Sequence, residues 1–301
     1  MKVAIFCDSE KILEVEKIRT IITSYDASVI IYDDASISTL QKEMTSPHAI
    51  MEDVTHVLFL YSASALSNTN FIFFSGYALG AGLPMLLISE IADPHLPDIW
   101  RNLFILLDLS SFDSYFEGEK KSFLEKKQKE IAKKQLLEKG YSLFNSNYVE
   151  AVKNGEVEIA SLFIDAGFSP FEKDLLGTPV LSLAVRERHI DMVRMLIERG
   201  AIIDATSKDR NYTALMDAAQ IGELEIAKLL LDANANPNIQ SKDGQTALIL
   251  AVGRQDVSVI EILLKAHSDY NIKDSMGMSA LDYVNLFRNE KILALFAKEN
   301  T

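Results

Sequence analysis

Short apolar runs alternate with helical patterns over the first 115 residues. The runs have the length and continuity of strands buried on both faces, and they lie at Lys2–Cys7, Ala27–Tyr32, His56–Tyr61, Pro84–Ile88 and Phe104–Leu109. Between them, the apolar spacing predicts helices at Glu10–Tyr25, Ser38–Met51 and Thr69–Gly82. Strands that alternate with helices favour right-handed crossovers and a parallel sheet. We therefore expect an α/β domain with a flavodoxin-like five-stranded parallel sheet of strand order 2-1-3-4-5.

A charged helical pattern follows at residues 116–141. Apolar residues recur near helical spacing at Phe123, Leu124, Ile131 and Leu136, with Lys and Glu between them. Gly140 suits the position just after a helix end. We predict one amphipathic helix that connects two domains, with its lysines in solvent.

From residue 142 onwards the apolar pattern repeats. Small residues occupy one position of the first helix of each unit, at steps of 33, 34, 33 and 33 residues: Ala151, Ala184, Ala218, Ala251 and Val284. Turn positions recur between the helices at Gly155, Arg188, Gly222 and Gln255, and after the second helix at Gly167, Gly200, Asn234 and His267. A fixed period of this length predicts an all-α solenoid of about five units, whose first and last units act as caps.

These units resemble the ankyrin repeat. The opening Tyr212-Thr213-Ala214-Leu215 returns as Thr246-Ala247-Leu248, close to the ankyrin opening pattern. The resemblance implies that residues 142–301 bind a protein partner through the finger tips and the exposed side of each first helix. On this sequence those positions are Thr178, Arg186, Asp209, Arg210, Tyr212, Gln220, Ile221, Lys242, Gln245, Arg254, Met276 and Met278. An exposed Tyr, several Arg and two Met there suit an interface.

Residues 58–85 resemble a second family. The text Leu58-Phe59-Leu60-Tyr61-Ser62, then Ser75-Gly76-Tyr77-Ala78 and Gly82-Leu83-Pro84, is similar to nucleoside 2-deoxyribosyltransferases and, more distantly, to Toll/interleukin-receptor domains. Both families cleave N-glycosidic bonds to a ribose, and a carboxylate acts as nucleophile or stabilises the developing charge. In this alignment Phe74 stands where the family has its Glu, and Asn68 where it has its Asp.

Three interpretations of residues 1–115 follow from that departure. The domain is a scaffold without ligand, a pocket that binds a nucleoside or nucleotide without cleaving it, or a transferase or NAD-cleaving enzyme whose carboxylate comes from Asp8 or Glu52. A retained pocket would lie at the carboxyl ends of the strands. Its candidate residues are Asp8, Ser9, Ser62, Ser64, Asn68, Phe74 and Ser75. The glycines Gly76, Gly80 and Gly82 lie on and after a helix, where we expect them to let it pack closely on the sheet.

Charge and composition limit the classes of partner that the chain can bind. The chain has 301 residues and a net charge of −13, and residues 1–115 hold 6 Lys and Arg against 15 Asp and Glu. An acidic surface repels phosphate backbones, so we expect no nucleic-acid partner. We find no apolar run long enough to cross a membrane, no metal-ligand spacing among the five histidines and no catalytic motif, and we expect no cofactor. The single cysteine, Cys7, is consistent with a cytoplasmic protein.

The sequence thus predicts an α/β domain at 1–115, a connecting helix at 116–141 and ankyrin repeats at 142–301. We expect the whole chain to act as an interaction scaffold or adaptor rather than as an enzyme.

Overall fold

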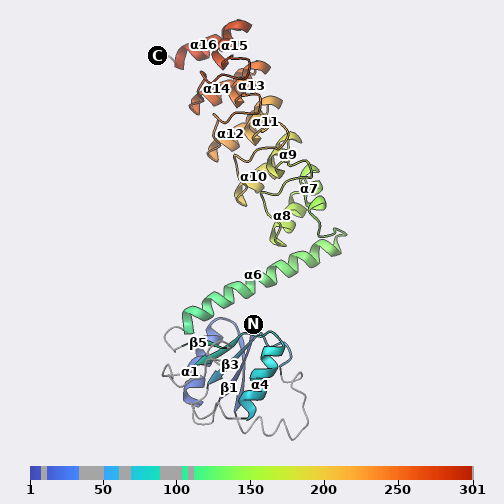
Figure 1. The fold of residues 1–301 in the computed structure, drawn as a ribbon, viewed down its shortest axis with the longest axis vertical. Helices are drawn as coiled ribbons and strands as arrows, with labels where there is room; N and C mark the ends of the chain where they lie inside the picture. Colours follow the sequence, from blue (N-terminus) through green and yellow to red (C-terminus); the bar gives the residue numbers. More distant parts are fainter. Residues whose placement is uncertain (8–11, 34–50, 61–68, 89–103, 108–111, 300–301) are drawn as a thin grey trace. The chain divides into compact units, whose positions relative to one another are not determined.

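A computed structural model of the chain describes residues 1–7, 12–33, 51–60, 69–88, 104–107 and 112–299 (Figure 1). The chain forms two compact units, Met1–Lys127 and Gln128–Thr301. The helix α6 (Phe112–Glu138) contains the boundary between them. Of the predicted helix Ser38–Met51, residues 38–50 lie outside the described ranges.

The N-terminal unit contains a parallel sheet with the order β2-β1-β3-β4-β5. The strands are β1 (Lys2–Cys7), β2 (Ser28–Asp33), β3 (His56–Leu60), β4 (Met85–Ile88) and a three-residue edge strand β5 (Ile105–Leu107). Every pair is parallel, and Val3 of β1 is in register with Val29 on one side and His56 on the other. The predicted parallel α/β sheet is confirmed.

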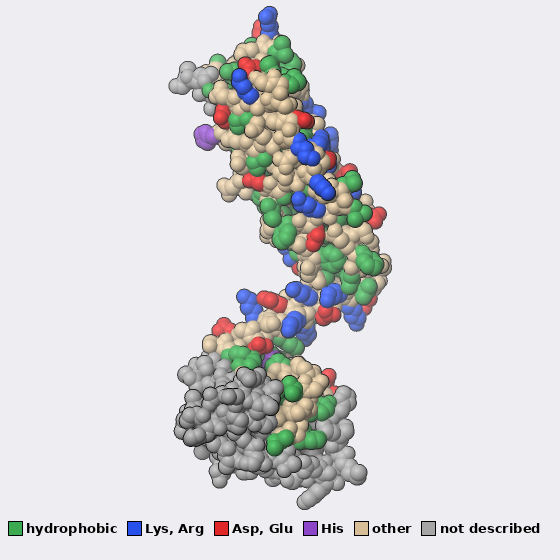
Figure 2. Space-filling view, in the orientation of Figure 1, with side chains coloured by type: hydrophobic (Ala, Val, Ile, Leu, Met, Phe, Trp, Pro, Cys, Tyr) green, Lys and Arg blue, Asp and Glu red, His purple; other side chains and the backbone are tan. Residues whose placement is uncertain are grey.

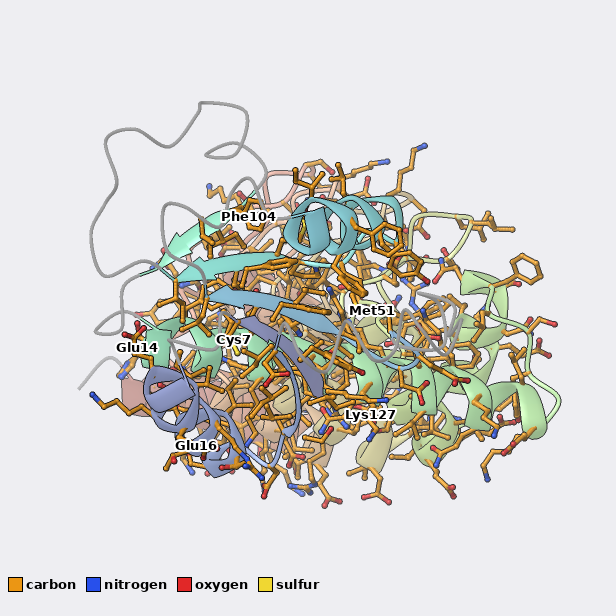
Figure 3. All side chains as sticks on the ribbon, turned by 90° about the horizontal axis from the view of Figure 1, so that it is seen from below. Cys7, Glu14, Glu16, Met51, Phe104 and Lys127 are labelled. Atoms are coloured by element: carbon orange, nitrogen blue, oxygen red, sulfur yellow. The ribbon has the colours of Figure 1, made fainter. Side chains whose placement is uncertain are left out.

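The two faces of this sheet carry separate apolar cores. Alternate residues of β1 point to opposite faces, as the pleat of a strand requires. Ala4 and Phe6 pack with Phe74 and Ala78 of α4 (Thr69–Gly80). The intervening residues of β1 pack against α1 (Ile12–Ser24) with Ile18 and Ile22 on the other face. Figure 3 labels Met51 and Phe104 among the side chains of the first core and Cys7 in the second.

The glycines of α4 do not pack on the sheet, which corrects our expectation. Phe74 and Ala78 occupy the buried side of the helix, so Gly76 and Gly80 lie on its exposed side. A Cβ atom added at either glycine meets nothing within 4 Å. Gly82 follows in a left-handed turn with φ +67°, a conformation that favours glycine.

The first half of α6 belongs to the N-terminal unit. His56, at the start of β3, lies 3.1 Å through its Nε2 from the Glu119 carboxylate, and its Nδ1 lies 3.0 Å from the Thr55 hydroxyl. His56 is buried, so its polar atoms are satisfied inside the protein. Its role in the described fold is structural.

Residues 145–299 form a row of helix pairs. The first helices of the pairs are α7 (Asn145–Lys153), α9 (Val180–Arg186), α11 (Ala214–Ile221), α13 (Ala247–Arg254) and α15 (Ala280–Phe287). The second helices are α8 (Val157–Asp165), α10 (Ile190–Glu198), α12 (Leu224–Asp232), α14 (Val257–Lys265) and α16 (Glu290–Glu299). First helices pack on neighbouring first helices, and second helices on second (Figure 1). The predicted solenoid is confirmed.

The repeat period places the same structural feature in each unit. The small residue of each first helix, from Ala151 to Val284, is at most 1% exposed. The predicted turn positions are left-handed even where the residue is not glycine, with φ of 63° at Arg188 and 61° at Gln255. The ends of the second helices behave alike, with φ of 64° at Asn234.

Helix starts follow the same period. The side chains of Thr213, Thr246 and Ser279 each accept a hydrogen bond from a backbone N–H three residues on, which caps α11, α13 and α15. Ser279 forms a reciprocal capping box with Asp282. Pro179 stands at the equivalent position before α9 without a side-chain cap, and the helix still begins at Val180.

Both ends of the repeat core are covered. Ala132 and Leu136, in the second half of α6, are buried in the repeat core, so this part of the helix covers the first pair. At the other end Ile292 and Phe296 of α16 complete the same core, and the Phe296 ring lies 5.8 Å from that of Tyr270. A solenoid needs such caps because its terminal units lack one neighbour.

Candidate functional site

The candidate site is the surface made by the first helices and the segments that precede them. We call these segments fingers, and they comprise residues 169–179, 202–213, 236–246 and 269–279. Neighbouring fingers are joined by backbone hydrogen bonds from Lys208 N to Gly177 O (3.1 Å), from Lys242 N to Arg210 O (3.0 Å) and from Ser275 N to Asp243 O (2.9 Å). The fingers therefore form one continuous edge, held by the stacked helices below them.

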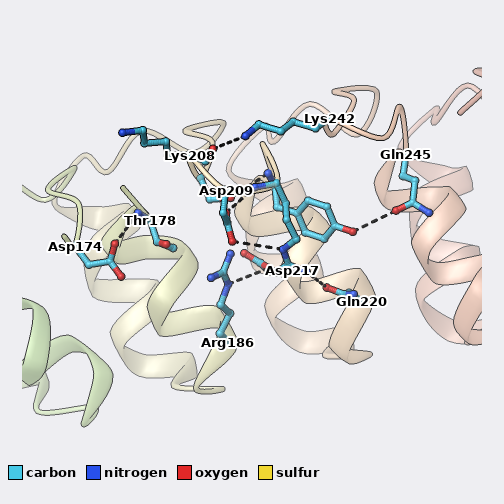
Figure 4. Close-up of polar contacts among 12 residues, drawn as sticks. Asp174, Thr178, Arg186, Lys208, Asp209, Asp217, Gln220, Lys242 and Gln245 are labelled. Atoms are coloured by element: carbon cyan, nitrogen blue, oxygen red, sulfur yellow. Dashed lines mark hydrogen bonds and ion pairs between the residues drawn. The ribbon is translucent and has the colours of Figure 1, made fainter. Parts of the chain in front are cut away.

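An ion cluster lies between the second finger and the first helices (Figure 4). Asp217 of α11 has its Oδ1 3.1 Å from Arg186 Nε of α9 and 3.5 Å from Arg210 Nη2 of the finger. The Arg210 guanidinium also donates a 3.0 Å hydrogen bond to Gln220 Oε1. The Asp217 side chain is 2% exposed, against 25% for Arg186 and 40% for Arg210. One buried carboxylate thus holds two half-exposed arginines against the array.

Burial and charge act in opposite directions on this cluster. Burial raises the pKa of Asp217, and the guanidinium groups of Arg186 and Arg210 oppose that rise. On the exposed side, the hydroxyl of Ser207 and the backbone N–H of Arg210 lower the pKa of Asp209. Among the described residues, Asp217 Oδ2 has no hydrogen-bond partner.

Two predicted contact residues are not at the surface. Tyr212 is 4% exposed, because the Arg210 guanidinium lies 4.1 Å over its ring and its hydroxyl donates to Gln245 Oε1 at 3.2 Å. Thr178 is 3% exposed, inside a turn where its N–H donates to Asp174 Oδ1 at 2.8 Å. The expectation of an exposed tyrosine was therefore wrong, and Arg210 covers that position.

The other predicted contact residues lie on this surface with different exposures. Met276 is the most open, at 73%. The exposed residues are Asp209, Gln220, Lys242, Arg254 and Met276, and the partly exposed ones are Arg186, Arg210, Ile221, Gln245 and Met278. Whether a partner contacts them stays a prediction.

Three residues of this surface escaped our sequence reasoning. Leu175 and Leu176, at the tip of the first finger, are 101% and 75% exposed. Asp217 left a signal that could have been found, because the two neighbouring units hold Leu183 and Leu250 at its register position, although the end units hold Glu150 and Tyr283 there. A charge where both neighbouring units hold leucine indicates a unit-specific contact.

Most of the residues predicted to form the ligand pocket of the N-terminal unit lie outside the described ranges. Asp8, Ser9, Ser62, Ser64 and Asn68 lie outside the described residues. Of the two that remain, Phe74 is 1% exposed, with its ring centroid 4.5 Å from that of Phe6, and it is part of the core. Ser75 is buried and donates its hydroxyl to Ile72 O at 3.0 Å.

Within the described ranges, no helix combines the length and the apolar character needed to cross a bilayer. In the same ranges there is no group of three or more His, Cys, Asp or Glu placed to hold a metal ion.

Comparison with known proteins finds sequence similarity both for the repeats alone and for the whole chain. A family model described as ankyrin repeats (3 copies) matches residues 148–241 and 215–301. A putative ankyrin repeat-containing protein from Treponema pallidum (strain Nichols) is 40% identical over 298 residues, which cover 98% of this chain and 99% of that protein. The similarity therefore includes the N-terminal unit.

Shorter similarities are confined to part of the chain. The human palmitoyltransferase ZDHHC13 is 29% identical over 107 residues, which are 36% of this chain and 17% of that protein. The human 2-5A-dependent ribonuclease is 35% identical over 72 residues, which are 24% of this chain and 10% of that protein. These proteins share a small part of their length with this chain. Together with the stacked helix pairs, the comparisons show that the chain belongs to the ankyrin-repeat proteins.

Proposed function

We propose that the chain is an interaction scaffold whose finger edge and first helices bind a protein partner. The observation that carries the proposal is the set of large apolar side chains held open at finger tips, Leu175, Leu176 and Met276. Exposed apolar residues on a rigid, polar-rimmed surface are typical of interaction sites. The stacked units hold that surface in place before binding, so little conformational entropy is lost on association.

A site-specific crosslinking experiment tests the proposal on the full chain. A photoreactive phenylalanine analogue is placed at Gln220, exposed on α11, and in a matched variant at Lys228, exposed on α12. Each variant is irradiated in lysate of the source organism, and the adducts are identified by mass spectrometry. We expect a discrete protein adduct from position 220 and none from position 228.

Equal adducts from both positions, or adducts from position 228 alone, would contradict the proposed surface. A single-residue change Met276→Asp provides the confirmation, since it places a charge on an exposed tip without disturbing the core. It should weaken formation of the same adduct at position 220.

A second candidate function concerns the N-terminal unit. We propose that this unit has a flavodoxin-like fold of the deoxyribosyltransferase type. We further propose that it binds a nucleoside or nucleotide without cleaving it. Two observations favour it: the strand order reverses direction at β1, where such sheets bind ligands, and Phe74 fills the core at the position of the family's Glu. We also propose the domain division predicted from the sequence, with domains at 1–115 and 142–301 joined by a connecting helix at 116–141. We propose a cytoplasmic location for the protein as well. A thermal-shift panel of nucleotides and nucleosides tests the proposed ligand binding, and no stabilisation at millimolar ligand would leave a bare scaffold.

A further inference from the structure

The fingers repeat one dipeptide whose two charges have different structural roles. Each of the four fingers contains a Lys-Asp pair, at Lys173-Asp174, Lys208-Asp209, Lys242-Asp243 and Lys273-Asp274. Read as sequence, each pair is neutral. In the structure all four lysines are exposed, whereas Asp274 is buried and Asp174 is half-buried; Asp209 and Asp243 are exposed beside their lysines.

Three of these aspartates, Asp174, Asp209 and Asp274, accept hydrogen bonds from backbone N–H groups of their own fingers. Asp174 Oδ1 accepts from the N–H groups of Leu176 (2.9 Å) and Thr178 (2.8 Å). Asp274 Oδ1 accepts from two N–H groups in the same way, and its Oδ2 accepts from the Tyr283 hydroxyl at 2.7 Å. Asp209 Oδ1 accepts from the N–H of Arg210 at 2.7 Å. Their negative charge therefore stabilises the turns of the fingers.

The lysines remain at the surface. Lys242 Nζ donates to the backbone oxygen of Lys208 at 2.7 Å, and Lys173 Nζ donates to that of Thr206 at 3.1 Å. A carbonyl neutralises no charge, and an ammonium group has two further donors. Four of the five units add further cations, namely Arg186, Arg210, Arg254 and Arg288. Nearby carboxylates offset part of this charge, because Arg186 and Arg210 share Asp217 and Arg254 lies 4.0 Å from Asp256. Figure 2 shows Lys and Arg side chains gathered on the side of the array where α9, α11 and α13 lie.

These exposed lysines and arginines lie in a region whose net charge is negative. Residues 142–301 hold 16 Lys and Arg against 23 Asp and Glu, so the repeat region as a whole is acidic. Cations in such a region are attracted to an acidic partner at the finger edge, and the acidic remainder repels a long polyanion such as nucleic acid.

We propose that the partner bound at the finger edge presents an extended acidic peptide segment to Lys208, Lys242, Lys273 and the neighbouring arginines. The inference rests on the proposed function and names the chemistry of its partner. Packed helices lie about 8–10 Å apart, and an extended chain advances about 3.3 Å per residue. A carboxylate at every third residue therefore meets the cations of successive units.

Fluorescence anisotropy on the full chain tests the inference with three labelled probes. The first is a 12-residue peptide with four Glu at every third position among Ser and Gly. The second has the same composition with its four Glu contiguous, and the third is oligodeoxythymidylate of the same charge. We expect the spaced peptide to bind most tightly, with an affinity that falls as salt rises.

Matched variants locate the binding. The finger variant carries Lys208→Gln, Lys242→Gln and Lys273→Gln, and the control carries Lys121→Gln, Lys126→Gln and Lys134→Gln, three exposed lysines of α6. Both remove three charges. Three exposed ion pairs correspond to a loss of about tenfold in affinity, which we expect for the finger variant alone.

Three outcomes would overturn the inference: equal affinity for the spaced and contiguous peptides, equal losses in both variants, or tighter binding of the oligonucleotide that is lost in the finger variant. Failure of the inference is distinguishable from failure of the proposed function. If no peptide binds while the crosslink at position 220 persists, the partner is not acidic but the surface still binds a protein.

Discussion

Replacing Phe74 tests whether this position of the N-terminal unit lies in a closed core or lines a cleft. The Phe74 side chain is 1% exposed, and its ring packs between those of Phe6, at 4.5 Å, and Phe73, at 5.2 Å. A buried Phe removes roughly 150–250 Å² from water, worth about 4–6 kcal/mol as an upper bound. Measured Phe→Ala changes in cores cost about 3–5 kcal/mol. We therefore expect Phe74→Ala to lower the free energy of unfolding by about 4 kcal/mol.

The adjacent residue supplies a control of the same type. Phe73 is 48% exposed, so Phe73→Ala should cost less than about 2 kcal/mol, since only part of its surface is buried. Urea titration followed by the fluorescence of the single Trp, Trp100, reports on this part of the sequence. With a slope of about 1–3 kcal/mol per molar urea, the Phe74→Ala midpoint should fall by about 2 M.

Introducing a carboxylate at the same position sharpens the test. Phe74→Glu places a carboxylate in the same core, so at pH 7.5 it should be less stable than Phe74→Ala. Burial raises the pKa of a carboxyl, so the folded form binds its proton more tightly, and stability should recover as pH falls through that raised pKa. A Phe74→Glu protein as stable as wild type, or one that releases free base from NAD or deoxynucleosides, would refute this reasoning.

Three further predictions address other features. Gly76→Ala should stabilise α4 by about 0.5–1 kcal/mol, because the new Cβ meets nothing within 4 Å. Gly82→Ala should destabilise the protein, because Gly82 has a φ of +67°, which alanine rarely adopts. The thermal unfolding midpoints of the two variants test both expectations. Ala251→Val should lower the free energy of unfolding by about 1–3 kcal/mol, since that position is fully buried between units, and circular dichroism at 222 nm in urea measures it. The backbone N–H and hydroxyl of Ser279 hold the pKa of Asp282 below its ordinary 3.8, so its stabilising contribution is full above pH 3.8 and is lost as pH falls through the lower folded value. The difference in Tm between wild type and Asp282→Asn should therefore shrink toward pH 3, and a constant difference would contradict the assigned cap.

The repeat region was predictable because its information is periodic. A fixed step placed Ala184, Ala218 and Ala251 between helices and predicted turns at Arg188 and Gln255, where no propensity of those residues indicates one; the structure shows both in the left-handed conformation. The exposure of Tyr212 was not predictable in this way. It depends on Arg210 folding over the ring and on Gln245 of the next unit, contacts that belong to one finger and not to the period.

The orientation of α4 was ambiguous for a different reason. The helix Thr69–Gly80 carries no charged residue, so its sequence has no polar side to mark which face meets water. Phe74 and Ala78 settle the orientation only once the sheet is present. The strands, in contrast, were located within one or two residues because buried parallel strands are short apolar runs between turns.

The bonds that join the units have a mechanical consequence. Arg199 contacts Asp165, the N–H of Asn236 donates to Asp204, and the N–H of Asp269 donates to Asn238, so each link spans about one unit of the array. Tension applied along such a row is transmitted in series, and the weakest junction at an end fails before the interior does. Stretching the protein between two beads should lengthen it in discrete steps, each releasing the contour length of one or a few helix pairs, and relaxation should re-form the junctions in the opposite order.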